Sequence, residues 1–222
     1  MPRRGNIQAM KHPALVCIAR HGETDWNTAG ILQGWLDVPL NATGRAQAEE
    51  MAAAFAGAGF AAVWTSPLRR AAETADIIAA ALHLPAPTAH AGLKERNFGL
   101  VQGMPKAELA ESNPLLMQQI QRRNPAADFV EGETMDAFAD RVFAALHAIG
   151  RHHPDQRVLA ITHGWTMDVV TRQLLHLPRN TVLNMKRKNG ESVWLEATRH
   201  AIAATAVPEM STTTASAPHP AR

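Results

Sequence analysis

The sequence is poor in the residues that build disulfide-linked or membrane-spanning proteins. Cys17 is the one cysteine among 222 residues, so no disulfide can form within a single chain. Cys17 falls in an apolar run and is expected to be a core residue. The most apolar stretch, residues 51–64, is too short to span a bilayer, and no apolar block follows the basic N-terminal leader. We therefore expect a cytoplasmic protein without a membrane partner.

The sequence also has little net charge. Its formal charge is +2, and much of the excess lies in the leader at Arg3, Arg4 and Lys11. We therefore expect no nucleic-acid partner. The hydrophobic fraction of 46% is typical of a globular chain, and the length suits one domain. We place this domain at residues 13–200 and expect disorder in residues 1–12 and 201–222, which contain few large apolar residues.

Short apolar runs alternate with helical patterns between these tails. Residues 14–19, 60–65 and 158–162 read as buried strands, and Thr134 begins the clearest amphipathic helix. Pro114 interrupts any single long helix in the segment after Gly99. Two extended runs flank Asn189-Gly190, which suits a hairpin turn at a sheet edge. The pattern predicts a three-layer α/β/α sandwich whose sheet is mostly parallel with an antiparallel edge hairpin.

Charged and polar residues follow the expected strands directly. Arg20 and His21 follow the first strand, Arg70 follows the second, and His163 follows the strand at 158–162, while Glu95 lies in a Gly-rich loop. Ligands of open α/β sheets bind beyond the carboxyl ends of the strands, so these groups are expected to share one crevice. Arginines match phosphate oxygens, a histidine can attack phosphorus, and a carboxyl can handle the leaving-group proton. This set predicts phosphoryl transfer without a metal ion.

Four short segments carry these residues. They read RHGET at 20–24, SPLRRA at 66–71, ERNFG at 95–99 and THG at 162–164. In sequence and in order they resemble the motifs of the histidine phosphatase superfamily, also called the phosphoglycerate mutase-like family. The resemblance extends over residues 15–197 and includes EGET at 131–134, which precedes a long helix in many members.

The resemblance implies a role for each site residue. His21 would be the nucleophile that becomes phosphorylated, and Glu95 the proton donor and acceptor. Arg70 is preferred to Arg69 because the family's arginine directly precedes a small residue, here Ala71. The groups implied to hold the phosphate or line the substrate pocket are Arg20, Asn27, Gln33, Gly34, Arg70, His163 and Gly164. No metal and no cofactor is implied.

Three functions remain open at this stage. The first is a phosphatase acting on a small phosphomonoester, and the second is a cofactor-dependent phosphoglycerate mutase. Mutases of the family use a longer insertion than the roughly 30 residues between Gly99 and Glu131, and they usually have tyrosine where Phe98 stands. Both differences favour hydrolysis. The third is a non-catalytic module that binds phosphorylated ligands, although His21 and Glu95 are both present.

Two further segments have more than one interpretation. His152-His153-Pro154 lacks partnering carboxylates or cysteines, so we expect surface residues rather than a metal site. Arg122-Arg123 fits either a solvated helix end or a contact to an anionic substrate. The natural substrate is open among sugar phosphates, phosphoglycerate, ribazole phosphate and phosphoprotein, and a homodimer is also open.

Overall fold

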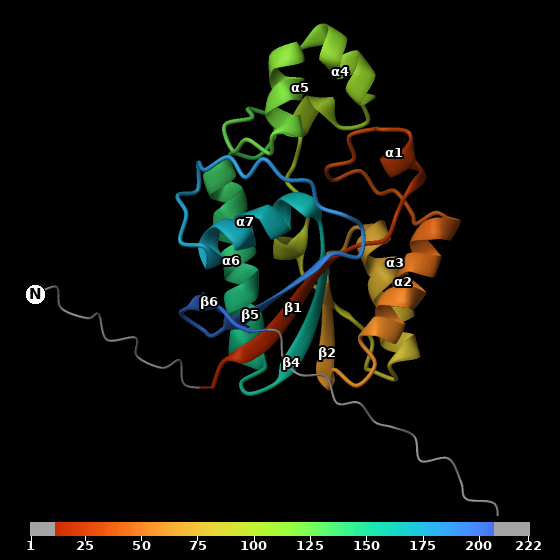
Figure 1. Cartoon of the computed structure of the whole chain (residues 1–222), viewed down its shortest axis with the longest axis vertical. Helices are drawn as coiled ribbons and strands as arrows, with labels where there is room; N and C mark the ends of the chain where they lie inside the picture. The colour runs from red at the N-terminus through yellow and green to blue at the C-terminus, as the bar shows by residue number, and fades with distance from the viewer. Residues whose placement is uncertain (1–11, 207–222) are drawn as a thin grey trace, which may run out of the picture.

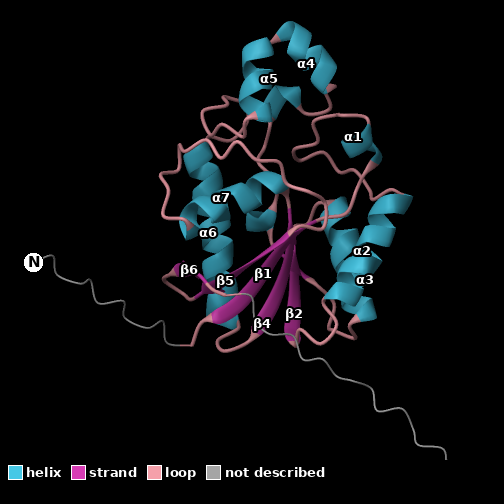
Figure 2. Cartoon of the chain, in the orientation of Figure 1, coloured by secondary structure: helices cyan, strands magenta, loops and turns pink. Residues whose placement is uncertain are grey.

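A six-stranded sheet forms the centre of the protein, as Figures 1 and 2 show for a computed structural model that describes residues 12–206. The strand order is β3-β2-β4-β1-β5-β6. The strands are β1 (Ala14–Arg20), β2 (Phe60–Thr65), β3 (Thr88–Ala89), β4 (Arg157–Thr162), β5 (Ser192–Ala197) and β6 (Ile202–Ala204). The first four are parallel, whereas β5 is antiparallel to β1 and β6 to β5. The predicted fold class is confirmed.

The strand β1 is buried on both faces, as its continuous apolar run predicted. Val16 and Ile18 pack in the core beneath α6 (Met135–His152) and α7 (Gly164–Leu174). Cys17 and Ala19, which alternate with them, pack in the core beneath α2 (Ala42–Ala54) and α3 (Arg69–Ala81). The two helix layers therefore enclose the sheet, and Figure 2 shows one pair of helices on each side of it.

The helix α6 begins where the sequence placed its start. The side chain of Thr134 caps the helix by accepting a hydrogen bond of 3.2 Å from the amide of Ala137. Its apolar stripe, which includes Phe138, Val142 and Leu146, is fully buried against the sheet. Neither this helix nor any other within residues 12–206 is long and apolar enough to cross a membrane.

Two short helices, α4 (Lys106–Ser112) and α5 (Pro114–Gln121), lie apart from the sheet at one end of the molecule (Figure 1). Pro114 occupies the first turn of α5, so the predicted interruption separates the two helices. They cover the end of the sheet at which the parallel strands finish. On the other side of that end, the four-residue α1 (Asp25–Thr28) follows β1. We refer to α4 and α5 as the cap.

The antiparallel edge differs from the prediction in position. The hairpin joins β5 and β6, whereas residues 181–188 form no strand. Asn189-Gly190 instead lies against the end of β1, where Asn189 donates to the carbonyl of His21 at 2.8 Å and Gly190 to that of Arg20 at 3.2 Å. Disorder from residue 201 onward was also expected, and this is wrong for β6. The rest of both predicted tails, residues 1–11 and 207–222, lies outside the described residues.

Candidate active site

A cavity of about 350 Å³ lies between the carboxyl ends of the parallel strands and the cap. Residues from β1, α3, α5, the loop around Glu95 and the segment before β5 line it. The full set is Arg20, His21, Asn27, Ile31, Leu32, Gln33, Gly34, Arg70, Glu95, Phe98, Lys106, Met117, Ile120, Gln121, Arg123, Trp165, Lys186 and Arg187. A volume of this size suits a small-molecule ligand.

His21 is the first residue after β1 and is 3% exposed. Its Nδ1 lies 2.6 Å from the carbonyl oxygen of Gly22, and its Nε2 lies 3.3 Å from Nε of Arg70. Because a carbonyl can only accept and an arginine can only donate, Nδ1 carries the proton and Nε2 the lone pair. Burial, followed by the charges of Arg70 and Arg20, lowers the pKa of His21 well below its usual value. The imidazole is therefore neutral and has the nucleophilic lone pair on Nε2.

Arg70 lies in the first turn of α3 and is 1% exposed. Its Nη1 donates to the carbonyl of Leu36 at 3.0 Å, and its Nη2 to that of Gly34 at 2.8 Å. These two carbonyls fix the plane of the guanidinium beside His21. Burial lowers the pKa of Arg70 to about 10, so the group remains charged at neutral pH. Of the two adjacent arginines, the neighbour Arg69 is exposed and pairs with Glu73 instead.

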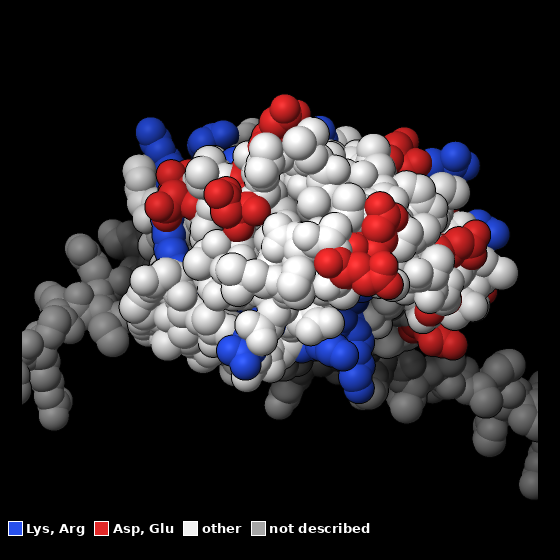
Figure 3. Space-filling model, turned by 90° about the horizontal axis from the view of Figure 1, so that it is seen from above, with Lys and Arg blue, Asp and Glu red and all other residues white. Residues whose placement is uncertain are grey.

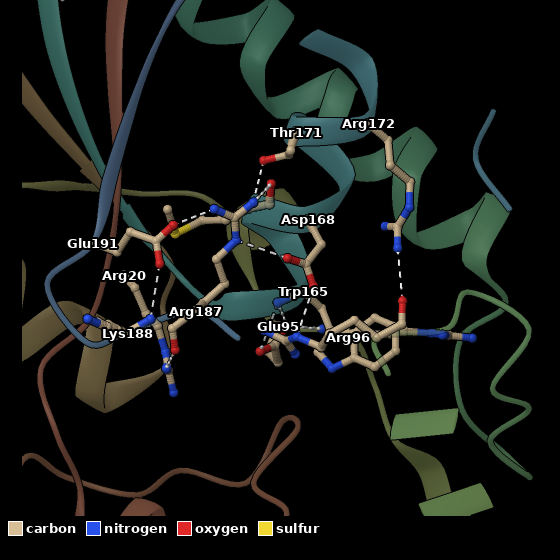
Figure 4. Close-up of polar contacts among 12 residues, drawn as sticks. Arg20, Glu95, Arg96, Trp165, Asp168, Thr171, Arg172, Arg187, Lys188 and Glu191 are labelled. Carbon is tan, nitrogen blue, oxygen red and sulfur yellow. Dashed lines mark hydrogen bonds and ion pairs between the residues drawn. The ribbon is translucent and has the colours of Figure 1, made fainter. Parts of the chain in front are cut away.

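Arg20 is the last residue of β1 and reaches the same cavity. Its Nη1 donates to the backbone carbonyl of Arg187, which sets the direction of its guanidinium (Figure 4). Burial lowers the pKa of Arg20 to about 10, with a further contribution from Arg123. Arg20 and Arg70 thus place two positive charges next to His21.

His163 lies against His21 but does not line the cavity. Its ring centroid is 5.0 Å from that of His21, and its Nε2 is 2.8 Å from the hydroxyl of Ser66. The Ser66 hydroxyl also accepts a hydrogen bond of 3.2 Å from the amide of Leu68, the residue that precedes α3. Burial lowers the pKa of His163 well below its usual value, so both imidazoles are neutral.

Glu95 faces the N-terminus of α7. Its carboxylate accepts hydrogen bonds from the amide of Trp165, in the first turn of this helix, at 3.2 Å, and from the amide of Arg96 at 3.0 Å. Burial raises the pKa of Glu95, although Arg123 and the Arg96 hydrogen bond act in the opposite direction. A carboxyl that keeps its proton to higher pH can serve as a general acid.

The remaining predicted residues divide into two groups. Asn27, Gln33 and Gly34 line the cavity. The side-chain oxygen of Asn27 accepts hydrogen bonds from the amide and the hydroxyl of Thr24, which leaves the NH₂ group of Asn27 to donate to a ligand. Gly164 does not line the cavity. A Cβ at Gly164 would lie 2.4 Å from Nη2 of Arg123, so glycine is what allows this arginine to approach α7.

Four more cations line the cavity, of which the sequence pointed to one, Arg123, and not to the other three. Arg123 was left open there as a solvated or ligand-contacting residue, and it lines the cavity, whereas Arg122 is exposed. Lys106, Lys186 and Arg187 lie outside the motifs, and nothing in their local sequence indicates that they reach the cavity. With Arg20 and Arg70 they bring six basic side chains to a cavity that has one carboxylate, that of Glu95.

The face of the molecule that carries the cap does not show this excess of positive charge. Figure 3, seen from the end of the molecule that carries the cap, shows acidic and basic side chains in separate small groups around an uncharged area. The basic side chains that line the cavity make it suited to bind an anion. No group of three or more His, Cys, Asp or Glu side chains that could hold a metal ion occurs within residues 12–206. His152 and His153 instead pack around the ring of Trp64.

Known proteins are similar to this chain in sequence. The chain is 37% identical over 149 residues to the protein named uncharacterized phosphatase PhoE of Bacillus subtilis (strain 168), a match that covers 67% of this chain and 71% of that protein. It is 35% identical over 157 residues to metal-independent phosphoserine phosphatase of Arabidopsis thaliana, over 70% of this chain and 66% of that one, just under two thirds of the relative's length. Relatives named probable phosphoglycerate mutase match as well.

Solved structures of phosphatases have a similar fold. A mycobacterial glucosyl-3-phosphoglycerate phosphatase in complex with VO3 has a TM-score of 0.72 and 26% identity, over 82% of this chain and 92% of that chain. Residues 16–208 match the profile of the histidine phosphatase superfamily, branch 1. With that match over most of its length, the chain belongs to the histidine phosphatase superfamily.

Proposed function

We propose that this protein is a phosphatase that hydrolyses a small phosphomonoester through a phosphohistidine at His21, without a metal ion. The observation that carries the proposal is the orientation of the His21 ring. Its Nδ1 is held by the Gly22 carbonyl, and its Nε2 lone pair lies next to a buried guanidinium. A neutral imidazole fixed in this tautomer is ready to attack an anion held by that guanidinium.

The reaction would proceed in two steps. In the first, His21 Nε2 forms a bond to phosphorus while the ester P–O bond breaks, and Glu95 gives its proton to the leaving alcohol. In the second, water attacks the same phosphorus, Glu95 takes a proton from that water, and the N–P bond breaks. Inorganic phosphate leaves and His21 returns to its neutral form, so one residue acts first as acid and then as base.

The cationic side chains would do the work that magnesium does in many phosphoryl transfers. Arg70 is buried and Arg20 is half-buried, so their charges act through a medium that screens them less than water does. Fixed donors around the phosphoryl oxygens stabilise charge that develops in the transition state. The name of the plant relative, a metal-independent phosphatase, is in line with this part of the proposal.

The cap supports hydrolysis rather than isomerisation. It consists of two helices of 7 and 8 residues, a small cover for a cavity in which a mutase would have to retain a bisphosphate intermediate. Some relatives are named phosphatases and others phosphoglycerate mutases, so the two activities should be measured side by side.

We expect inorganic phosphate, and little 2-phosphoglycerate, when the protein is given 3-phosphoglycerate with a trace of bisphosphoglycerate. A panel of phosphomonoesters should be assayed in parallel, with the His21→Ala variant as the blank, because 3-phosphoglycerate need not be the natural substrate. Chelator should leave the rate of phosphate release unchanged. Isomerisation much faster than phosphate release would establish a mutase, and activity that requires added magnesium or zinc would contradict the metal-free mechanism.

A further inference from the structure

One buried carboxylate outside the cavity joins two arginines that line it. Asp168, in α7, is fully buried. Its Oδ1 lies 3.0 Å from Nε of Arg187, and its Oδ2 lies 3.0 Å from Nε of Arg123. The two arginines come from different segments, one after α5 and the other before β5. Asp168, which does not line the cavity, therefore ties both segments to α7.

Arg187 connects Asp168 to Arg20. Besides Asp168, its guanidinium contacts the hydroxyl of Thr171 and the carboxylate of Glu191, so the side chain is held on every side (Figure 4). Its backbone carbonyl accepts the hydrogen bond from Nη1 of Arg20. The direction of the Arg20 guanidinium in the cavity thus depends on where the anchored Arg187 holds its carbonyl.

Arg123 links the same carboxylate to the proposed acid. Its guanidinium carbon lies 5.2 Å from the ring centroid of Trp165, and the Trp165 amide donates to Glu95. Among the cations near Glu95, Arg123 has the largest effect on the pKa of that carboxyl, which it lowers. The exposed fraction of the Arg123 side chain is 15%, against none for its partner Asp168. Arg123 is thus partly open to the cavity and fixed from the inner side.

Stability alone is a poor reason for such an arrangement. Replacing a buried ion pair by apolar residues of similar volume is often neutral or stabilising, whereas removing one partner leaves an uncompensated buried charge. A single carboxylate shared by two arginines does, however, define where both guanidinium groups lie. Positioning is therefore the role that the geometry favours.

We propose that Asp168 is a positioning residue for anion binding, which fixes Arg123 directly and Arg20 through Arg187. The inference rests on the proposed function, because it assumes that the cavity binds a phosphoryl group. Asp168 itself does not touch the ligand. The contacts of His21 with Gly22 and Arg70 do not involve it, so the nucleophile keeps its orientation when Asp168 is changed.

The test measures the binding of vanadate. Binding is monitored by tryptophan fluorescence, because Trp165 contacts Arg123. We expect Asp168→Asn to raise the dissociation constant for vanadate on the order of tenfold. With nitrophenyl phosphate, kcat/KM should fall by a similar factor, because vanadate resembles the transition state that Arg20 helps to bind. Asp140→Asn is the matched control, because Asp140 pairs with Arg179 on the exposed surface of α6 at 2.7 Å.

A double-mutant cycle separates positioning from a general loss of structure. If Asp168 acts partly through Arg123, the effect of Asp168→Asn on vanadate binding should shrink in the Arg123→Gln background. Equal effects in both backgrounds would contradict the proposal. If Asp168→Asn does not fold, the double variant Asp168→Asn with Arg187→Met can be used, because it removes both charges of the pair. This double variant should still bind vanadate more weakly than the wild type. A dissociation constant equal to that of the wild type would also overturn the proposal.

The same titration tests the proposed function and the positioning role of Asp168 separately. A wild-type protein that binds neither vanadate nor inorganic phosphate would contradict the proposed function itself. Tight binding by the wild type and equally tight binding by Asp168→Asn would overturn only the positioning role.

Discussion

Replacing Glu95 by Gln should slow the formation of the phosphoenzyme from an alkyl phosphate by about 10²- to 10⁴-fold, the usual range for general acid catalysis. Gln keeps the shape of the side chain but has no acidic proton to give. An alkoxide is a poor leaving group, so its departure depends on that proton. Nitrophenolate leaves readily without one, and formation of the phosphoenzyme from nitrophenyl phosphate should slow far less.

Single-turnover mixing is the measurement that isolates this effect. In steady-state turnover the second role of Glu95, as base for water, would also be lost and would obscure the difference between substrates. Glu111→Gln, an exposed position on α4, serves as the control for removing one negative charge. Equal slowing for both leaving groups would show that Glu95 only positions the phosphate, and the acid would then lie elsewhere in the cavity.

The pH dependence gives a second measurement of the same group. Because burial raises the pKa of Glu95, the carboxyl keeps its proton to a higher pH than an ordinary glutamic acid. The rate of phosphoenzyme formation from an alkyl phosphate should therefore fall as pH rises through that raised pKa. Glu95→Gln should lose this decline, since no titrating acid is left.

Replacing Arg70 by Lys should lower kcat/KM by about 10²- to 10³-fold, comparable to removing one preorganised donor from a transition-state site. Lysine keeps the charge but cannot hold the planar contacts with the carbonyls of Gly34 and Leu36 while also facing His21. The matched control is Arg69→Lys, one residue earlier, whose side chain is 58% exposed and pairs with Glu73. Its kcat/KM should stay near that of the wild type.

This pair of variants also tests the choice between two adjacent arginines. If Arg69→Lys loses activity and Arg70→Lys keeps it, the buried guanidinium beside His21 does not bind the phosphoryl group. Thermal unfolding of both variants should be measured alongside, because the two carbonyls that Arg70 satisfies are part of the local structure.

The sequence predicted the parts of the fold that depend on local pattern. The apolar run at residues 14–19 identified a strand buried on both faces, and Pro114 identified the break between α4 and α5. Parallel strands finish at the same edge of the sheet, so residues that follow them could be expected together, and His21, Arg70 and Glu95 do line one cavity.

Features that depend on distant partners could not be predicted in the same way. Asn189-Gly190 has the composition of a hairpin turn, but it donates hydrogen bonds to the carbonyls of Arg20 and His21 at the end of β1. The strand β6 has only three residues and needs β5 as a partner. Asp168 reads in the sequence as one polar residue of an amphipathic helix, and only the folded chain brings Arg123 and Arg187 to it.

The central claim is that His21 becomes phosphorylated during turnover, and rapid mixing with a labelled phosphomonoester tests it most directly. After denaturing the protein within the first turnover, we expect label that is stable in alkali and lost in acid, as a phosphorus–nitrogen bond requires. The label should map to His21 and be missing from His21→Ala. Label that persists in His21→Ala, or an acid-stable phosphoester in its place, would contradict the account.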